Sequence, residues 1–347
     1  MKNNRGKVKG MKRIKQVNII FLVIVLLPYL VLTILPKRLF EGQLSTLLIS
    51  QALYAVPAII YIIMSQLSVR EAIRVHKIRW KTVLLTLLFS FTITPVMGYI
   101  SAVSQLFAKN EIGSTITSIA SEFPFWVSIT CIALIPAILE ETVYRGVFFC
   151  EYSKLNKRAA IFFKVCSFLL THEPPTKNVA FVSAFLFAAL HQNLNQFSYA
   201  LVMGIIFTLL IEATDSILSS MILHFCINGS SVLMIYLYQG ILDAFHITSE
   251  QVGGAEQLVS ELGAVTTDKV AIAQAVEMYT VPAIIGCILS YLVFRAIAMS
   301  EGRWETVRDI FSDKKESKVP WYQLITIPLI IGIGWCILNI IVLLFQQ

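Results

Sequence analysis

The sequence predicts an all-α protein, a polytopic bundle of about nine transmembrane helices with a cytoplasmic N-terminus. Hydrophobic residues make up 56% of its 347 positions and charged residues only 14%. Soluble globular domains carry roughly a quarter charged residues, so this chain has too few to cover a surface exposed to water. Apolar runs long enough to cross a bilayer recur from one end of the chain to the other.

The predicted spans follow these apolar runs in chain order. The first run follows a basic N-terminal stretch and is too long for the hydrophobic region of a signal peptide, so we expect it to be retained. The expected spans lie near residues 17–35, 45–65, 82–107, 123–149, 179–191, 197–211, 217–238, 279–298 and 321–345. The fifth and sixth are short for a membrane crossing, which takes about 20 residues.

The charges of the loops set the expected orientation. Lys and Arg are concentrated in the N-terminal tail and in residues 66–81, 150–178 and 299–319. Residues 108–122 and 239–278 carry mostly Glu and Asp. Because cytoplasmic loops of membrane proteins are enriched in Lys and Arg, this pattern places the N-terminus in the cytoplasm and the C-terminus outside. The net charge of +7 then reflects orientation in a membrane, and no nucleic-acid partner is expected.

Charged and titratable side chains inside apolar runs are costly, and they most often mark function. Such residues are Glu140, Glu141 and Arg145 in the fourth expected span, His191 at the end of the fifth, and His224 in the seventh. These residues are therefore the first candidates for a functional site.

The two adjacent glutamates are predicted to have different surroundings. On a helix Glu140 and Glu141 point about 100° apart. Glu141 and Arg145 have the spacing and the order of an ion pair. Glu140 has no partner on its own helix, and a carboxylate in a medium of low dielectric constant binds its proton more tightly, which suits a general base. Pro136 weakens the helix one turn earlier and favours a water-filled space. The alternative is an ion network that only packs helices near the cytoplasmic interface.

Two further pairs of residues are spaced by one helical turn. Phe187 and His191 share a helix face, so the ring could position the imidazole; a histidine that only packs at the interface is the alternative. His224 and Asn228 also share a face. They either join helices through hydrogen bonds or stabilise a developing oxyanion.

Together these patterns resemble the three signature motifs of the CAAX-protease and bacteriocin-processing family. The motifs are Glu140-Glu141-x-x-x-Arg145, Phe187-x-x-x-His191 and His224-x-x-x-Asn228. The resemblance covers residues 121–240 and implies an intramembrane endopeptidase in which Glu140 and His191 activate water. It further implies that His224 and Asn228 stabilise the oxyanion, while Glu141, Arg145 and Phe187 support the site.

The resemblance also raises the question of zinc, because family members have been described as metallopeptidases. His191, His224 and Glu140 could supply three ligands and leave a fourth position open. The sequence has no His-Glu-x-x-His pattern and Asn228 is a poor zinc ligand. We therefore favour a metal-free route and expect no cofactor.

The motifs divide the chain into three expected parts. Residues 1–120 form N-terminal transmembrane helices, residues 121–240 the catalytic core, and residues 241–347 an extracytoplasmic segment with two further helices. The expected partners are membrane lipid and a peptide or membrane-protein substrate, and the lysine-rich N-terminus favours a bacterial plasma membrane. An immunity or export factor that binds a hydrophobic peptide such as a bacteriocin, without cleaving it, is the main alternative. An ion-coupled transporter would not explain why His224 is paired with Asn228.

The short fifth span predicts a cavity. At 1.5 Å per residue it rises only about 18–20 Å, so His191 would end inside a hydrocarbon core of about 30 Å. Gln192, Asn193 and Asn195 follow directly and need water or protein partners at that depth. We expect a cavity here that opens toward the cytoplasm.

Overall fold

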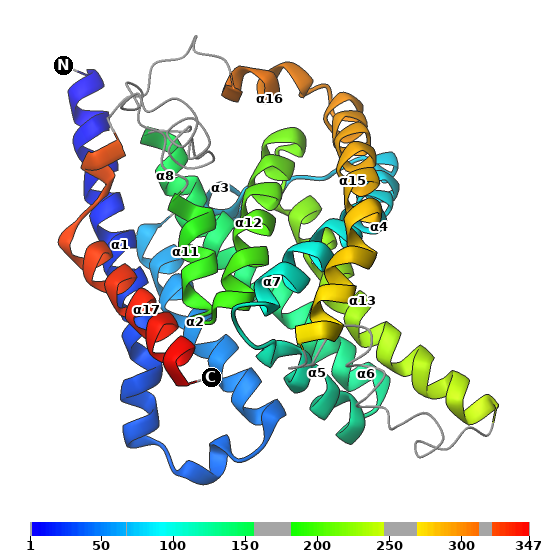
Figure 1. The fold of residues 1–347 in the computed structure, drawn as a ribbon. Coiled ribbons are helices and arrows are strands. Elements are labelled where there is room, and N and C mark those ends of the chain that lie inside the picture. The colour runs from blue at the N-terminus through cyan, green and yellow to red at the C-terminus, as the bar shows by residue number, and fades with distance from the viewer. Residues whose placement is uncertain (1, 67, 156–181, 246–268, 312–320, 347) are drawn as a thin grey trace, which may run out of the picture.

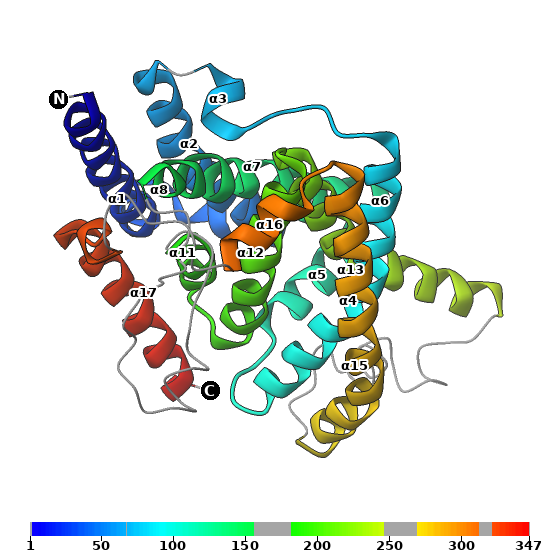
Figure 2. The same ribbon diagram turned by 90° about the horizontal axis from the view of Figure 1, so that it is seen from above.

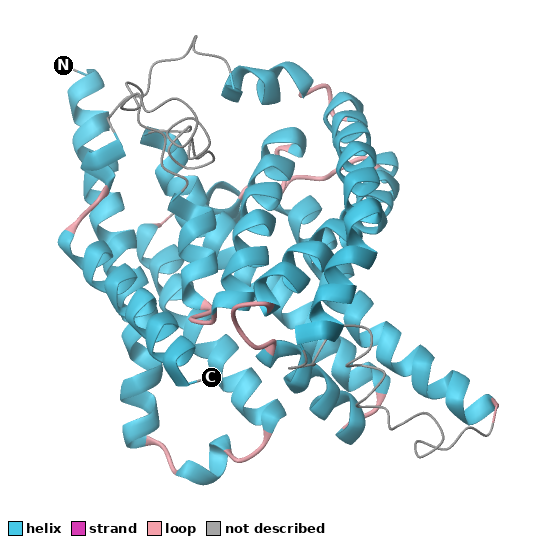
Figure 3. Ribbon diagram, in the orientation of Figure 1, coloured by secondary structure: helices cyan, strands magenta, loops and turns pink. Residues whose placement is uncertain are grey.

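The computed structural model describes residues 2–66, 68–155, 182–245, 269–311 and 321–346, and most of these residues are helical (Figure 1). Within these ranges no strand is present, and short loops connect the helices (Figure 3). Eight of the described helices are long and apolar enough to cross a membrane. The predicted fold class, a polytopic transmembrane helical bundle, is confirmed.

The longer elements match the predicted spans, with shifted ends. In chain order the helices are α1 (Lys2–Ile34), α2 (Gln43–Ser65), α3 (Val69–Ile73), α4 (Trp80–Gln105), α5 (Glu111–Glu122), α6 (Phe125–Ser128), α7 (Ile135–Glu141), α8 (Cys150–Leu155), α11 (Val182–Leu190), α12 (Leu194–Thr214), α13 (Ile217–Ala244), α15 (Lys269–Ser300), α16 (Trp304–Phe311) and α17 (Ile327–Gln346). Short 3₁₀ helices precede α2 and α17 at Lys37–Phe40 and Trp321–Leu324. Two π-helical stretches, η2 (Ile129–Leu134) and η3 (Thr142–Phe149), flank α7.

The fifth and sixth expected spans differ from the prediction in opposite ways. α11 is described over nine residues, too few to cross a membrane, and the predicted start at 179–181 lies outside the described residues. α12 has 21 residues and reaches spanning length, because it extends the predicted run at both ends. The predicted 239–278 segment is also shorter than expected, since α13 continues to Ala244 and α15 begins at Lys269.

α11 and α12 form the centre of the bundle. They lie between α1 and α17 on one side and α4 and α15 on the other (Figure 1 and Figure 2). The α11 side chains from 183 to 190 are all buried except Phe185, which explains why this helix has no polar face. A Cβ at Gly204 of α12 would lie 2.8 Å from the Cβ of Ala184 in α11, so glycine permits this close approach.

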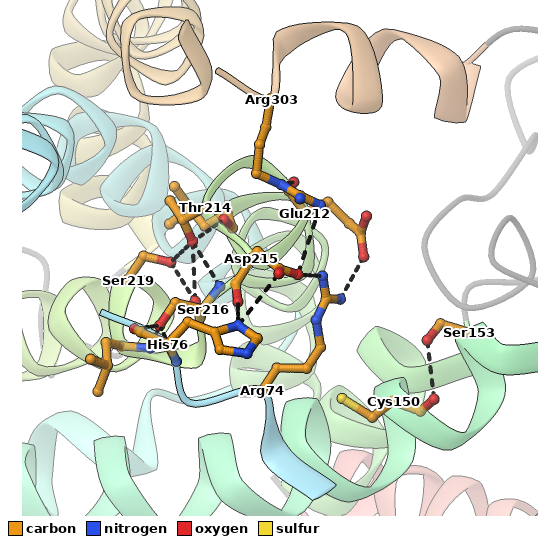
Figure 4. A network of polar contacts seen from close by, with 12 residues as sticks. Arg74, His76, Cys150, Ser153, Glu212, Thr214, Asp215, Ser216, Ser219 and Arg303 are labelled. Atoms are coloured by element: carbon orange, nitrogen blue, oxygen red, sulfur yellow. Dashed lines mark hydrogen bonds and ion pairs between the residues drawn. The ribbon is translucent and has the colours of Figure 1, made fainter. Parts of the chain in front are cut away.

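An ionic cluster closes the end of the bundle at which residues 68–81 lie (Figure 4). Arg74, which follows α3, donates a hydrogen bond of 2.7 Å to Glu212 in the last turn of α12 and a second hydrogen bond to Asp215. Arg303, which precedes α16, donates to the main-chain carbonyl of Glu212 over 2.8 Å. These four residues, called the ionic cluster below, join three helix connections at one end of the bundle.

Asp215 shows how strongly the cluster is held together. Its backbone has a φ of 56°, the left-handed conformation that ends α12. Burial by itself raises the pKa of the Asp215 carboxyl, but the hydrogen bond and charge of Arg74, with the charges of Arg303 and His76, outweigh burial and lower this pKa. The aspartate is therefore ionised near neutral pH and works as a fixed partner for the arginines.

Removing Arg74 tests the contribution of the ionic cluster to stability. We expect Arg74→Met to lower the free energy of unfolding by about 3 kcal/mol, because Glu212 is left buried without its main counter-charge. The matched control is Arg79→Met, whose side chain is 68% exposed and lies 4.0 Å from Glu301, and it should cost at most about 1 kcal/mol. Denaturation in mixed detergent micelles measures both, and equal effects would contradict a special role for the cluster.

Candidate active site

The site is built on a single long helical run, from α6 through η2, α7 and η3 to α8, which crosses the bundle over residues 125–155. Pro136 lies in the first turn of α7, where the backbone changes from π-helical to α-helical. Proline has no N–H to donate at this point. The two glutamates end α7. Glu141 is completely buried, whereas 13% of the Glu140 side chain is exposed. As expected from helical geometry, adjacent carboxylates therefore have different surroundings.

Glu141 belongs to a buried ion pair. Its Oε1 accepts a hydrogen bond of 2.9 Å from Nη1 of Arg145, and neither side chain is exposed. The guanidinium carbon of Arg145 lies 4.2 Å from the ring centre of Phe187 in α11 and 4.8 Å from that of Phe207 in α12. The predicted ion pair is present, and two aromatic rings flank the guanidinium of the arginine.

His224, on α13, lies between the two glutamates. Its Nδ1 is 3.1 Å from Oε1 of Glu141, and its Nε2 is 3.9 Å from Oε2 of Glu140. The ring stacks on Phe207, with 5.1 Å between the ring centres and 19° between the planes. A ring that donates from Nδ1 to Glu141 directs Nε2 toward Glu140, so Glu141 sets both the tautomer and the orientation of His224.

Glu140 has a partner that the sequence analysis did not identify. Gln51, near the middle of α2, donates from Nε2 to Oε1 of Glu140 over 2.8 Å, and Gln51 is only 4% exposed. The residue is a polar interruption of an apolar run, which is a signal of function in a membrane helix. Its link to Glu140 depends on how α2 packs against α7, which the sequence pattern does not specify.

His191 and Asn228 complete the set of predicted residues. Nδ1 of His191 is 2.9 Å from the main-chain carbonyl of Phe187, whose ring meets the imidazole edge to face. Within the described part of the chain the imidazole makes no hydrogen bond to Glu140, so its Nε2 is left for another partner. Asn228 donates from Nδ2 to the carbonyl of Ile132 over 3.2 Å, which occupies one of its two N–H groups.

A cavity of about 560 Å³ brings these residues together. Glu140, His191, His224 and Asn228 all line it, whereas Glu141 and Arg145 lie behind its wall. Phe187 and Gln51 are part of the lining as well. The structure thus places the residues predicted to be catalytic on the cavity wall, and the predicted supporting pair in the protein interior.

The expectation that this cavity opens toward the cytoplasm is wrong for the predicted orientation. The lining continues from the site to Asn110, Thr117 and Tyr238, at the end of the bundle opposite the ionic cluster and residues 66–81. The expectation was based on the depth of His191 in the membrane alone and did not include which ends of the neighbouring helices surround this residue. Asn195, just after His191, donates to Ser104 in the last turn of α4, so this turn lies toward the predicted outer end.

The described residues do not fit a bound zinc ion. No three His, Cys, Asp or Glu side chains among them are placed so that they could hold one metal ion together. Nδ1 of His224 bonds to Glu141 and Nδ1 of His191 bonds to a main-chain carbonyl, so only the Nε2 atom of each ring could face a metal ion. Within the described residues the His191, His224 and Glu140 side chains do not converge on one point as zinc ligands would, and no chemical step is assigned to a metal.

One segment of the chain matches a family of known proteins. Residues 122–230 match the family model described as type II CAAX prenyl endopeptidase Rce1-like. The matched segment contains all three motifs, from Glu140 to Asn228. No curated protein and no solved structure matches the chain.

Proposed function

The chain carries a domain of the Rce1-like CAAX-protease family of intramembrane endopeptidases, and we propose that it hydrolyses a peptide bond in a membrane-associated peptide or lipidated tail. The observation that carries the proposal is the position of Glu140. It is the one carboxylate on the described cavity wall, held by Gln51 on one side and facing Nε2 of His224 on the other. The proposed location is a bacterial plasma membrane.

In this proposal Glu140 acts as the general base. A water molecule between Glu140 and Nε2 of His191 gives its proton to the carboxylate and attacks the carbonyl carbon of the scissile bond. The tetrahedral intermediate collapses when Glu140 returns the proton to the leaving amine, which balances the step without a further reactant. Gln51 donates to Oε1 only, so Oε2 remains available for the water.

The oxyanion of the intermediate is assigned to His224 and Asn228. Asn228 has one N–H that is not used by Ile132, and both side chains line the cavity one helical turn apart. If Nδ1–H of His224 donates to Glu141, Nε2 can donate to an oxyanion only when the ring carries both protons. Glu141, 3.1 Å from Nδ1, supplies the counter-charge for that form while Glu140 holds the proton taken from water.

Exchanging each glutamate for glutamine distinguishes a catalytic role of the side chain from a role in the stability of the fold. We expect Glu140→Gln to fold and to lose about 10³-fold in kcat, because the general base is gone. We expect Glu141→Gln to lower the free energy of unfolding by about 3 kcal/mol, because Arg145 keeps its charge without a partner. Cleavage of a library of membrane-anchored peptides, followed by mass spectrometry, measures activity.

The control for both glutamates is Glu305→Gln on α16, where the side chain is 71% exposed. This substitution should change neither kcat nor the free energy of unfolding. A well-folded Glu140→Gln variant with full activity would refute the peptidase mechanism. If the wild type cleaves nothing but retains a hydrophobic peptide, the non-enzymatic immunity or export function is favoured instead.

Gln51 should act as a positioning residue. We expect Gln51→Leu to reduce kcat about tenfold with little change in KM, because Glu140 loses a hydrogen bond worth about 1.4 kcal/mol. Gln43→Leu makes the same change at an exposed position on the same helix and should leave kcat unchanged. A Gln51→Leu enzyme with wild-type kcat would remove Gln51 from the mechanism.

The metal-free route predicts that chelators do not inhibit. We expect full activity after dialysis against a chelator that strips zinc, and far less than one zinc per chain in elemental analysis of the active protein. Activity that disappears on chelation and returns with added zinc would show that a metal takes part and that the ligands rearrange to bind it.

A further inference from the structure

We propose that the cavity admits its substrate from the extracytoplasmic side, and that the substrate is a short, extended, uncharged stretch of peptide. The proposal rests on the peptidase function proposed above and deepens it by naming the side of access and the substrate class. Three observations support it: the position of the lining along each helix, the closure of the other end, and the chemistry of the wall.

From the level of the site, which is marked by Phe207 on α12 and His224 on α13, the lining residues continue toward one end of the bundle. On α4 they fall between Thr94 and Gln105, the half remote from Arg74. On α15 they are Ala275 and Tyr279, near its beginning. α5, at the same end of the bundle, contributes several residues (Figure 1). The cavity thus extends from the site in one direction only.

The other end of the bundle is closed by bonded side chains. The ionic cluster joins the linker before α4 to the turn between α12 and α13 (Figure 4). Ser216 in that turn donates to the carbonyl of His76 over 2.5 Å, and Thr214 bonds to Ser219 over 2.8 Å. A substrate entering from this end would have to break the cluster.

Loop charge identifies which side each end faces. The closed end contains the basic 66–81 segment and the connection at 299–303, and Arg79 of the first bonds to Ser300 of the second. The open end contains α5, which begins and ends with glutamate, and its basic pair Lys37 and Arg38 after α1 is an exception to the pattern that the five basic residues of the 66–81 segment outnumber. Because Lys and Arg are retained in the cytoplasm, the open end faces outside.

The wall of the cavity indicates what it binds. Glu140, His191 and His224 are the only Asp, Glu, Lys, Arg or His side chains among its described lining residues. The remainder of the lining combines apolar side chains with uncharged hydrogen-bonding groups, such as Ser231 and Thr115. A charged substrate residue would find no partner there, and burying it would be costly. The open part fits a peptide with apolar and small polar side chains.

The length of the open part limits the bound stretch. Asn228 and Tyr238 both line the cavity and are ten residues apart on α13, which corresponds to roughly 15 Å along the helix. An extended peptide covers that distance with roughly four to five residues. We therefore infer that about this many residues on one side of the scissile bond lie in the cavity.

Accessibility of single cysteines tests the side of access. The six native cysteines are replaced by alanine, and either Ser231→Cys on the cavity wall or Lys77→Cys at the exposed closed end is introduced. In sealed right-side-out vesicles, a membrane-impermeant maleimide should label Ser231→Cys but not Lys77→Cys. Opening the vesicles should make Lys77→Cys reactive.

The reverse pattern, or labelling of both cysteines in sealed vesicles, would overturn the proposed side of access. Failure to label Ser231→Cys in opened vesicles would overturn the proposal that the cavity is open to water. The same labelling is repeated in the Glu140→Gln variant, because labelling measures access to the cavity and does not require peptide cleavage. A protein that labels as expected but cleaves nothing would refute the peptidase function and leave the access route standing.

The substrate class is tested by protection of Ser231→Cys from the maleimide. The probes are the capped peptide acetyl-Ala-Leu-Ser-Leu-Ala-amide and its matched control acetyl-Ala-Leu-Lys-Leu-Ala-amide. We expect the uncharged peptide to slow labelling, and the lysine peptide to need about tenfold higher concentration for the same effect. Equal protection by both, or protection by neither, would overturn the assignment of an uncharged peptide.

Discussion

The ion pair between Glu141 and Arg145 is the interaction on which the rest of the site depends. Each charge would cost of the order of several kcal/mol to bury alone, and the pair is held by its neighbours even though Oε2 of Glu141 and Nε and Nη2 of Arg145 have no hydrogen-bond partner in the described structure. Arg145 contacts Phe187 of α11 and Phe207 of α12, while Glu141 engages His224 of α13. A single pair of charges thus fixes four helical segments relative to one another.

This arrangement explains why two adjacent glutamates have different tasks. Because α7 is helical at this point, fixing Glu141 in the interior turns Glu140 by about 100°, toward the cavity. Glu140 is then held by a neutral amide from Gln51 and not by an arginine. Glu140 lines the cavity, where water and substrate can reach it, whereas Glu141 is enclosed with Arg145. The proposed division between base and support follows from the partners.

The sequence predicted those features that depend on local spacing. Composition and apolar runs predicted the helical membrane bundle, and the four-residue spacing predicted the contact between Glu141 and Arg145. The sequence analysis missed what depends on packing between distant segments. Gln51 meets Glu140 across 89 positions of the chain, and no local pattern connects them. In the predicted orientation, the end toward which the cavity extends was missed for the same reason, since it depends on which helix ends surround His191.

The two ends of the bundle use charge in opposite ways, and the cost of burial accounts for the difference. At the closed end, Arg74, Glu212 and Asp215 are paired in the folded chain itself, so they remain satisfied whether or not a substrate is present. On the cavity wall an ion pair would block the space, and an unpaired charge would be left without a partner once water is displaced. A wall of hydroxyls, amides and apolar groups avoids both. Displacing water with an uncharged peptide then lowers the local dielectric constant around Glu140, His191 and His224, and the charges that develop there during hydrolysis interact more strongly.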